Sequence, residues 1–263
     1  MDKSEWSEIQ EGEIEYHLGK DKDRILDFNI PYWNSLLSKV NPHVTITDDT
    51  RILEVGCGCC GVLMALDTGM LTGLDSLMDQ YLAHFDFLHD ARPKWVCSAA
   101  ENMDFPEPFD IIFNINSLDH MFDPQKAAQK FDQHLVPGGT LVISLNCHNT
   151  DFFWKYYSRF YRQVDSHHPF HFRPKDVLEM FPEYELIEVE DIDELYFPHM
   201  KQYQEKVLQQ KGTVWNKVFV SMFNPFKYAV AVAVLALGWQ VHRKKPKGKA
   251  IFSTYLFVLK KPK

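Results

Sequence analysis

The chain has 263 residues, which is enough for one domain with a buried core and an insertion. Its hydrophobic content of 45% and charged content of 24% are ordinary for a globular protein. The formal net charge of −8 argues against a nucleic-acid partner, because binding to phosphates favours a basic face. The amino terminus is charged and lacks the apolar stretch of a secretory signal, so we expect a cytoplasmic protein.

Residues 1–45 are expected to form a helical cap ahead of the core. Apolar side chains recur at helical spacing near residues 13–17 and again over residues 25–37, which is typical of amphipathic helices. His17 lies in the first of these segments. Contact with a ligand and simple surface exposure are both open for it, and surface exposure is the favoured interpretation.

The most informative segment begins with a short apolar run at residues 51–55 and continues into a glycine-rich turn at residues 56–61. The run predicts a buried parallel strand, and glycines at 56 and 58 allow positive φ angles and close approach of a ligand to the main chain. We expect a helix to start at Val62, with its free amides pointing at the contents of the loop. The segment therefore predicts a nucleotide-binding loop at the carboxyl end of a strand.

Two kinds of nucleotide are compatible with this loop. Residues 56–61 satisfy the G-x-G-x-x-G pattern of dinucleotide sites, although that pattern alone is weakly specific. A dinucleotide site holds a pyrophosphate, which a carboxylate inside the turn would repel. Glu54 precedes the first glycine closely, and a carboxylate there favours a ligand with a cationic head, such as S-adenosylmethionine with its ammonium and sulfonium groups.

The following segment alternates strands with helices. Apolar runs predict strands at residues 70–75, 95–97, 109–113 and 140–145, and a helix is expected from Pro124, because proline fits the first helical turn. The second strand ends at Asp75, about 20 residues beyond the first motif, where an acid can bind the hydroxyls of a ribose. The alternation predicts a doubly wound parallel sheet of the α/β class.

Over residues 50–150 the chain resembles the class I S-adenosylmethionine-dependent methyltransferases. The resemblance is carried by an ordered set of short motifs, namely Glu54-Val55-Gly56-Cys57-Gly58, Leu74-Asp75, Ala100-Glu101-Asn102, Phe109-Asp110-Ile111-Ile112, Leu118-Asp119-His120 and Val136-Pro137-Gly138-Gly139. It implies a seven-stranded, mostly parallel sheet with helices on both faces and an antiparallel last strand. The methyltransferase core would span residues 46–194, and residues 250–263 would supply the last strand and a tail.

The resemblance also implies that S-adenosylmethionine is the cofactor, with contacts at the ends of successive strands. The implied contacts are Glu54, Gly56, Cys57, Gly58, Asp75, Ser76, Leu77, Ala99, Ala100, Glu101, Asn114, Ile115 and Asn116. The first four would face the methionine part, and Asp75 would bind the ribose. Ser76 and Leu77 would lie against the adenine, residues 99 and 100 at its edge, and residues 114–116 beneath the sulfonium.

Methyl transfer to oxygen usually needs a base that takes up the proton of the acceptor, and histidine has a suitable pKa. His120, His148 and His168 are candidates at the carboxyl edge of the sheet, with Asp119 as an orienting partner. His148 is favoured, His120 is the second choice, and catalysis by proximity without a base stays open. For the histidines at 167, 168 and 171 a structural turn is favoured over substrate contact or metal binding, and no metal site is predicted there or at the clustered cysteines 57, 59 and 60.

Residues 195–249 are predicted to form a helical insertion before the last strand. Its apolar run at residues 228–239 is short for a membrane span, which needs about 20 residues. Tryptophans and a basic flank at residues 215–245 leave contact with a membrane surface open, although a buried cap or a homodimer contact is the favoured interpretation. Membrane contact would make the protein peripheral to the membrane and its acceptor lipid-linked.

The sequence therefore predicts a methyltransferase that uses S-adenosylmethionine to methylate an oxygen or nitrogen of a small-molecule, sugar or lipid-linked acceptor. An NAD(P)-dependent oxidoreductase is the first alternative, and it is disfavoured by Glu54 and by the turn at residues 137–139 before the fifth strand. A non-catalytic, nucleotide-binding relative is the second alternative. Cys60 and Ala99 allow it, because they depart from the residues that the family often carries.

Overall fold

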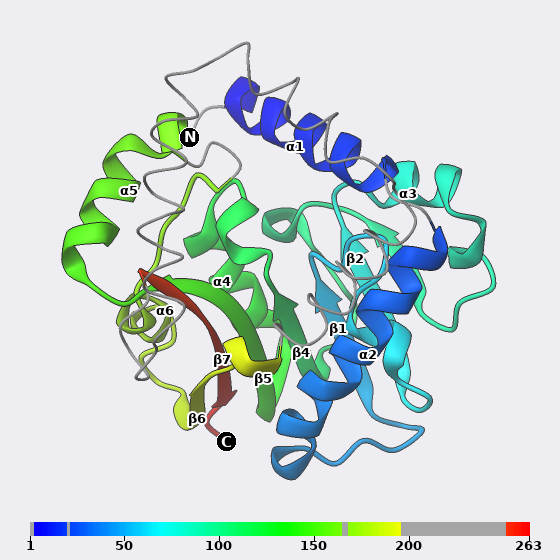
Figure 1. The fold of residues 1–263 in the computed structure, drawn as a ribbon. Coiled ribbons are helices and arrows are strands. Elements are labelled where there is room, and N and C mark those ends of the chain that lie inside the picture. Colours follow the sequence, from blue (N-terminus) through cyan, green and yellow to red (C-terminus); the bar gives the residue numbers. More distant parts are fainter. Residues whose placement is uncertain (1–2, 20–21, 165–167, 196–250) are drawn as a thin grey trace.

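The computed structural model describes residues 3–19, 22–164, 168–195 and 251–263. They form a seven-stranded sheet with the strand order β3-β2-β1-β4-β5-β7-β6 (Figure 1). The strands are β1 (Arg51–Val55), β2 (Met70–Asp75), β3 (Lys94–Cys97), β4 (Phe109–Ile115), β5 (Leu135–His148), β6 (Glu185–Asp191) and β7 (Phe252–Lys260). Strands β1 to β5 pair in parallel, and β7 lies antiparallel between β5 and β6. The predicted α/β sheet with an antiparallel last strand is confirmed.

The helices accompany this sheet in chain order. Those of the described residues are α1 (Lys3–Leu18), α2 (Lys22–Val40), α3 (Met78–His84), α4 (Pro124–His134), α5 (Asp151–Val164) and α6 (Pro174–Glu179). α1 and α2 confirm that the segment before the first strand is helical. α4 begins at Pro124 as predicted, because the side chain of Asp123 caps it by accepting a hydrogen bond from the Lys126 amide at 3.1 Å.

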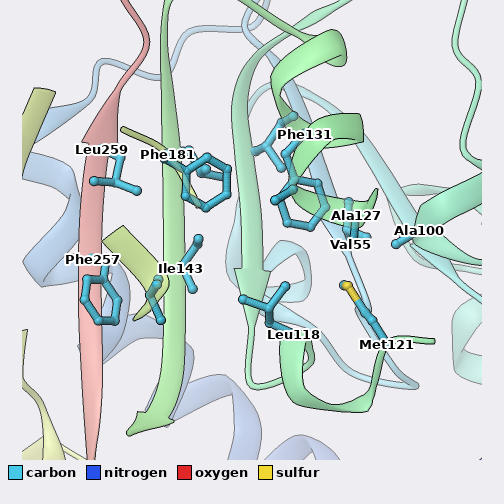
Figure 2. Packing of buried hydrophobic residues seen from close by; sticks show 14 of the residues in the cluster. Val55, Ala100, Leu118, Met121, Ala127, Phe131, Ile143, Phe181, Phe257 and Leu259 are labelled. Atoms are coloured by element: carbon cyan, nitrogen blue, oxygen red, sulfur yellow. The ribbon is translucent and has the colours of Figure 1, made fainter. Parts of the chain in front are cut away.

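The core lies on both faces of the sheet, since successive residues of a strand point to opposite sides. One face joins Val55, Ile143 and Phe257 to Phe131 of α4 (Figure 2). The other face joins the neighbouring strand residues, such as Ile52 and Val142, to α2. Helices therefore cover both faces, as the resemblance implied.

The strand order reverses between β1 and β4. The chain moves outward from β1 to β2 and β3 on one side, and from β4 to β5 on the other. The loops that leave the carboxyl ends of β1 and β4 therefore diverge, and open α/β sheets bind their ligands in the crevice at such a point.

Two expectations about local structure are corrected. Residues Val62–Ala65 form only a short 3-10 turn, η2, where we expected an α-helix. β5 begins at Leu135 and ends at His148, well beyond residues 140–145, because its pairing with β7 continues as far as His148 and Phe252. The extension of β5 to His148 thus arises from a strand that is remote in the sequence.

The predicted insertion at residues 195–249 lies outside the described residues, apart from its first position. The same holds for the segment 215–245 for which membrane or dimer contact was left open. In the part of the chain that the structure describes, no helix combines the length and apolar character that crossing a membrane requires.

Candidate functional site

A cavity opens at the carboxyl ends of β1, β2 and β4, and α1 passes over it (Figure 1). Its volume is about 650 Å³, which includes space that is open to solvent. The residues that line it come from α1 and from four loops: Trp6, Gln10, Glu13, His17, Val55, Gly56, Gly58, Leu74, Asp75, Ser76, Leu77, Tyr81, Ser98, Ala99, Ala100, Glu101, Asn116, Ser117, His120 and Met121. The cavity thus occupies the crevice that the strand order creates.

The loop after β1 needs its glycines. Gly56 has φ +73°, and a Cβ added there would lie 2.3 Å from the side-chain oxygen of Ser117. Gly58 has φ +56° and open space where a Cβ would stand. Residues with side chains rarely adopt such φ angles, so another residue at Gly58 would have a conformational cost, whereas at Gly56 it would also collide with Ser117.

Glu54 does not line the cavity, and the expectation that it faces the methionine part of a cofactor is corrected. Its carboxylate is buried beneath the loop, where Oε1 accepts from the Val62 amide at 2.9 Å and Oε2 from the Leu63 amide at 3.1 Å. Those amides, which we expected to face a ligand, are therefore engaged. Burial raises the pKa of Glu54 to about 7, against the opposing effect of the two amide hydrogen bonds.

Asp75 is the acid that the structure places at the cavity wall, at the end of β2. Its Oδ2 accepts from the Gly58 amide at 2.8 Å and its Oδ1 from the Leu77 amide at 2.9 Å. Each carboxylate oxygen keeps a further lone pair, so the group can still accept bonds from ligand hydroxyls. Burial raises the pKa of Asp75, while the two amide hydrogen bonds oppose the rise.

The loop that follows β3 forms another part of the wall, with residues 98–101 lining the cavity. Glu101 is buried, and its Oε1 accepts from the Asp123 amide at 2.8 Å, which links this loop to the start of α4. After β2, the Ser76 hydroxyl donates to Gln10 Oε1 of α1 at 2.6 Å. These bonds join the walls of the cavity to neighbouring elements.

Three further residues that the resemblance implied as cofactor contacts do not line the cavity. Cys57 is buried against Gly73, and Ile115 points into the core. Asn114 is buried and donates to the Val55 carbonyl at 2.9 Å and to the Ser117 side chain at 2.7 Å, so it braces the loop from behind. Asn116 does line the cavity, in the left-handed conformation at φ 49°.

The two histidines proposed as bases occupy different places. His148 is buried at the end of β5, with its Nε2 3.1 Å from Nδ1 of His171, and it packs against Tyr157 and Phe252 outside the cavity wall. The structure thus places His148 outside the cavity wall, and its role as a base stays a prediction. His120 does line the cavity, and its carbonyl accepts a 3.2 Å hydrogen bond from the Trp6 indole of α1.

The contribution of α1 was missed by the sequence analysis. Trp6, Gln10, Glu13 and His17 all reach the cavity, so His17 is not the simple surface residue that we favoured. Their spacing of three or four residues places them on one helical face. That signal was present in the sequence, but nothing in it showed which surface the face would cover.

The charge of the cavity has one sign. Glu13, Asp75 and Glu101 contribute carboxylates, and among the described residues of the lining there is no lysine or arginine. Ligands that carry phosphates need compensating cations, whereas a ligand with ammonium and sulfonium groups gains from nearby carboxylates. The donor set therefore fits S-adenosylmethionine better than a dinucleotide.

Comparison with known proteins agrees with this geometry. Residues 53–143 match a family described as a methyltransferase domain. A tRNA U34 carboxymethyltransferase of Pseudoalteromonas atlantica is 26% identical over 111 residues, which are 40% of this chain and 34% of that protein. The chain thus spans about a third of the length of this curated relative.

Solved structures with the same fold cover most of the chain. Phosphoethanolamine N-methyltransferase 2 of Haemonchus contortus, solved with S-adenosylhomocysteine, superposes with a TM-score of 0.60 at 20% identity, over 88% of this chain and 53% of that one. The [4+2]-cyclase SpnF gives 0.58 at 18% identity, over 87% of this chain and 80% of that one. The sheet order is that of the class I S-adenosylmethionine-dependent methyltransferase fold, and the family match over residues 53–143 agrees with it.

Proposed function

We propose that this chain binds S-adenosylmethionine in the cavity beneath α1 and transfers its methyl group to an oxygen or nitrogen of a small molecule. The observation that carries the proposal is the acidic lining at the reversal point of the sheet, to which the described residues contribute no lysine or arginine. The likeness to a cyclase shows that the fold alone does not fix the chemistry, so the argument depends on the cavity.

Each wall of the cavity has a role in this proposal. Asp75 accepts hydrogen bonds from the ribose, and the loop at residues 98–101 encloses the adenine. Gly56, Gly58 and Asn116 provide a close backbone approach for the methionine part, and Glu13 offers a carboxylate from α1. Once bound, S-adenosylmethionine supplies a methyl group on a positively charged sulfur.

His120 is the residue that we propose to hold the proton of the acceptor. Its Nδ1 lies 3.6 Å from Glu13 Oε1, and its Nε2 lies 3.9 Å from Asp119 Oδ1. The ring therefore lies between a carboxylate of α1 and one of the loop after β4, at the wall of the cavity where an acceptor would deliver its proton. α1 covers this position and limits the access of water.

A small acceptor fits this chain better than a tRNA, the substrate that the name of the curated relative indicates. The net charge of −8 and the acidic cavity both repel phosphates. A lipid-linked acceptor stays a prediction, since the segment on which it depends is outside the described residues.

The proposal is tested by titration calorimetry of the full chain with S-adenosylmethionine, S-adenosylhomocysteine and NAD, using Asp75→Asn and the control Asp79→Asn, which changes an exposed acid on α3. We expect both sulfur nucleotides to bind and NAD to fail. Loss of hydrogen bonds to a charged group costs about 1.5–3 kcal/mol, so Asp75→Asn should weaken binding roughly 10- to 100-fold. Asp79→Asn should bind like the wild type.

Binding of NAD alone would refute the proposal, and absence of any nucleotide binding would favour the non-catalytic alternative. Transfer of a labelled methyl group, measured on pooled small metabolites and on bulk tRNA in parallel, identifies the acceptor class. Label in tRNA alone would overturn the small-molecule assignment.

A further inference from the structure

Three side chains that can bind a metal meet beside the cavity. Asp119 and His120 belong to η5 (Leu118–His120), a 3-10 turn that follows β4, and His168 lies in the segment before α6. One potential ligand atom from each residue lies within 4.8 Å of the other two. The fold brings His168 here from a distant part of the chain.

One oxygen of the buried Asp119 carboxylate has no hydrogen-bond partner in the part of the chain that the structure describes. The residue is 6% exposed, and within the described residues its Oδ1 has no hydrogen-bond partner. His120 Nε2 is 3.9 Å from Oδ1 and His168 Nε2 is 4.0 Å from Oδ2, distances too long for hydrogen bonds. A buried carboxylate is costly unless it is paired or binds a cation, so this arrangement needs an explanation.

A second polar atom at the same place is equally unsatisfied. His120 Nδ1 is buried and lacks a hydrogen-bond partner among the described residues, with Glu13 Oε1 at 3.6 Å. The rings of His120 and His168 are 4.6 Å apart. Nε2 of His120 is the ring nitrogen nearer Asp119, whereas the unsatisfied Nδ1 lies nearer Glu13.

We propose that Asp119, His120 and His168 bind a divalent first-row transition metal ion such as Zn²⁺. Two imidazoles and one carboxylate form a donor set that suits such ions and leaves positions open for water or substrate. Ligand atoms at about 2.1 Å from one ion lie roughly 3.0–3.4 Å apart, so the three side chains need to approach by only about 1 Å. This proposal differs from our sequence analysis, which predicted no metal.

The position of the site gives the ion a role. His120 also lines the cavity, so the ion would lie at its wall. With His120 as its ligand, the ion would replace that side chain as the activating group, because a bound dication can orient an acceptor oxygen and lower its pKa. This last step rests on the proposed function, whereas the metal site itself does not. The side chain of His168 is 35% exposed, which leaves a path from solvent.

The test is calorimetric titration of Zn²⁺ into the tag-free, chelator-treated full chain. Variants are Asp119→Asn, which keeps the shape of the side chain, and His168→Gln, which changes a more exposed ligand; His89→Gln is the matched control away from the cluster. We expect one tight site in the wild type and in the control. Even outer-shell partners contribute roughly 10- to 100-fold to metal affinity, so loss of either ligand should weaken binding at least tenfold.

Equal Zn²⁺ affinity in the wild type and both cluster variants would overturn the proposal, because binding would then occur elsewhere, for instance at the cysteines. Failure of the wild type to bind Zn²⁺ would overturn it as well. A parallel titration of the wild type with S-adenosylmethionine separates the two proposals. Metal binding without cofactor binding refutes the proposed function alone, and the reverse result refutes the metal site alone.

Discussion

Glu54 makes the stability of the protein depend on pH in a way that its replacement should abolish. The ordinary pKa of the group is 4.5, and burial raises it to about 7 in the folded protein. Between these values the folded state binds more protons than the unfolded state, so the free energy of unfolding falls as pH rises. The stabilisation that the protonated Glu54 adds to the free energy of unfolding is thus fully present below about pH 4.5, and it is lost as pH rises through 7.

The size of the effect follows from the shift in pKa. One unit corresponds to 1.36 kcal/mol, so the shift of Glu54 amounts to about 3 kcal/mol between pH 4.5 and pH 8. In Glu54→Gln the side chain stays neutral and this term disappears, although its amide group cannot accept from both the Val62 and Leu63 amides. The variant therefore loses some stability at all pH values, but its stability relative to the wild type should improve by about 3 kcal/mol from pH 4.5 to pH 8.

Urea denaturation at several pH values measures this difference directly. The hydrogen bond that Glu54→Gln loses lowers stability equally at every pH. It therefore does not affect the comparison, which uses only how the stability difference between variant and wild type changes with pH. Parallel stability curves for Glu54→Gln and the wild type would refute the reasoning, since Glu54 would then titrate alike in the folded and unfolded states. Because Glu54 does not line the cavity, we also expect its replacement to weaken cofactor binding less than Asp75→Asn does.

Two further substitutions test the loop and the base. Gly58→Ala should lower the free energy of unfolding by roughly 1–2 kcal/mol, the cost of a left-handed conformation for a residue with a side chain. Gly56→Ala should lower it by more, because the added Cβ also collides with Ser117. Urea denaturation of the two variants measures the difference. His120→Gln should reduce kcat for an oxygen acceptor by about 10²- to 10⁴-fold, while His148→Gln leaves kcat unchanged. A loss confined to His148→Gln would return the base to the end of β5.

The fold could be predicted from the sequence because its signals are local. An apolar run such as residues 109–113 and a helix start such as Pro124 depend on neighbours in the chain, and the structure contains both elements. The length of β5 could not be predicted in the same way. Its extension to His148 depends on pairing with β7, which lies more than a hundred residues further along the chain.

The sequence predicts which residues stand at the ends of the strands, but it does not predict whether their side chains point into the cavity or away from it. Asp75 follows β2 directly and reaches the cavity. Glu54 and Asn114 belong to equally recognisable motifs, yet both turn away and support the loop from behind. Spacing in the sequence gives the place of a side chain but not the face toward which it points.

Although Glu54 does not face the cavity, carboxylates of other residues still favour a cationic ligand there. The sequence suggested that Glu54 would attract the ligand, but its charge is screened from the cavity by the loop that it supports. The carboxylates at the cavity belong to Asp75 on β2, Glu101 after β3 and Glu13 on α1. Because Glu13 lies on α1, this helix supplies part of the charge that selects the ligand.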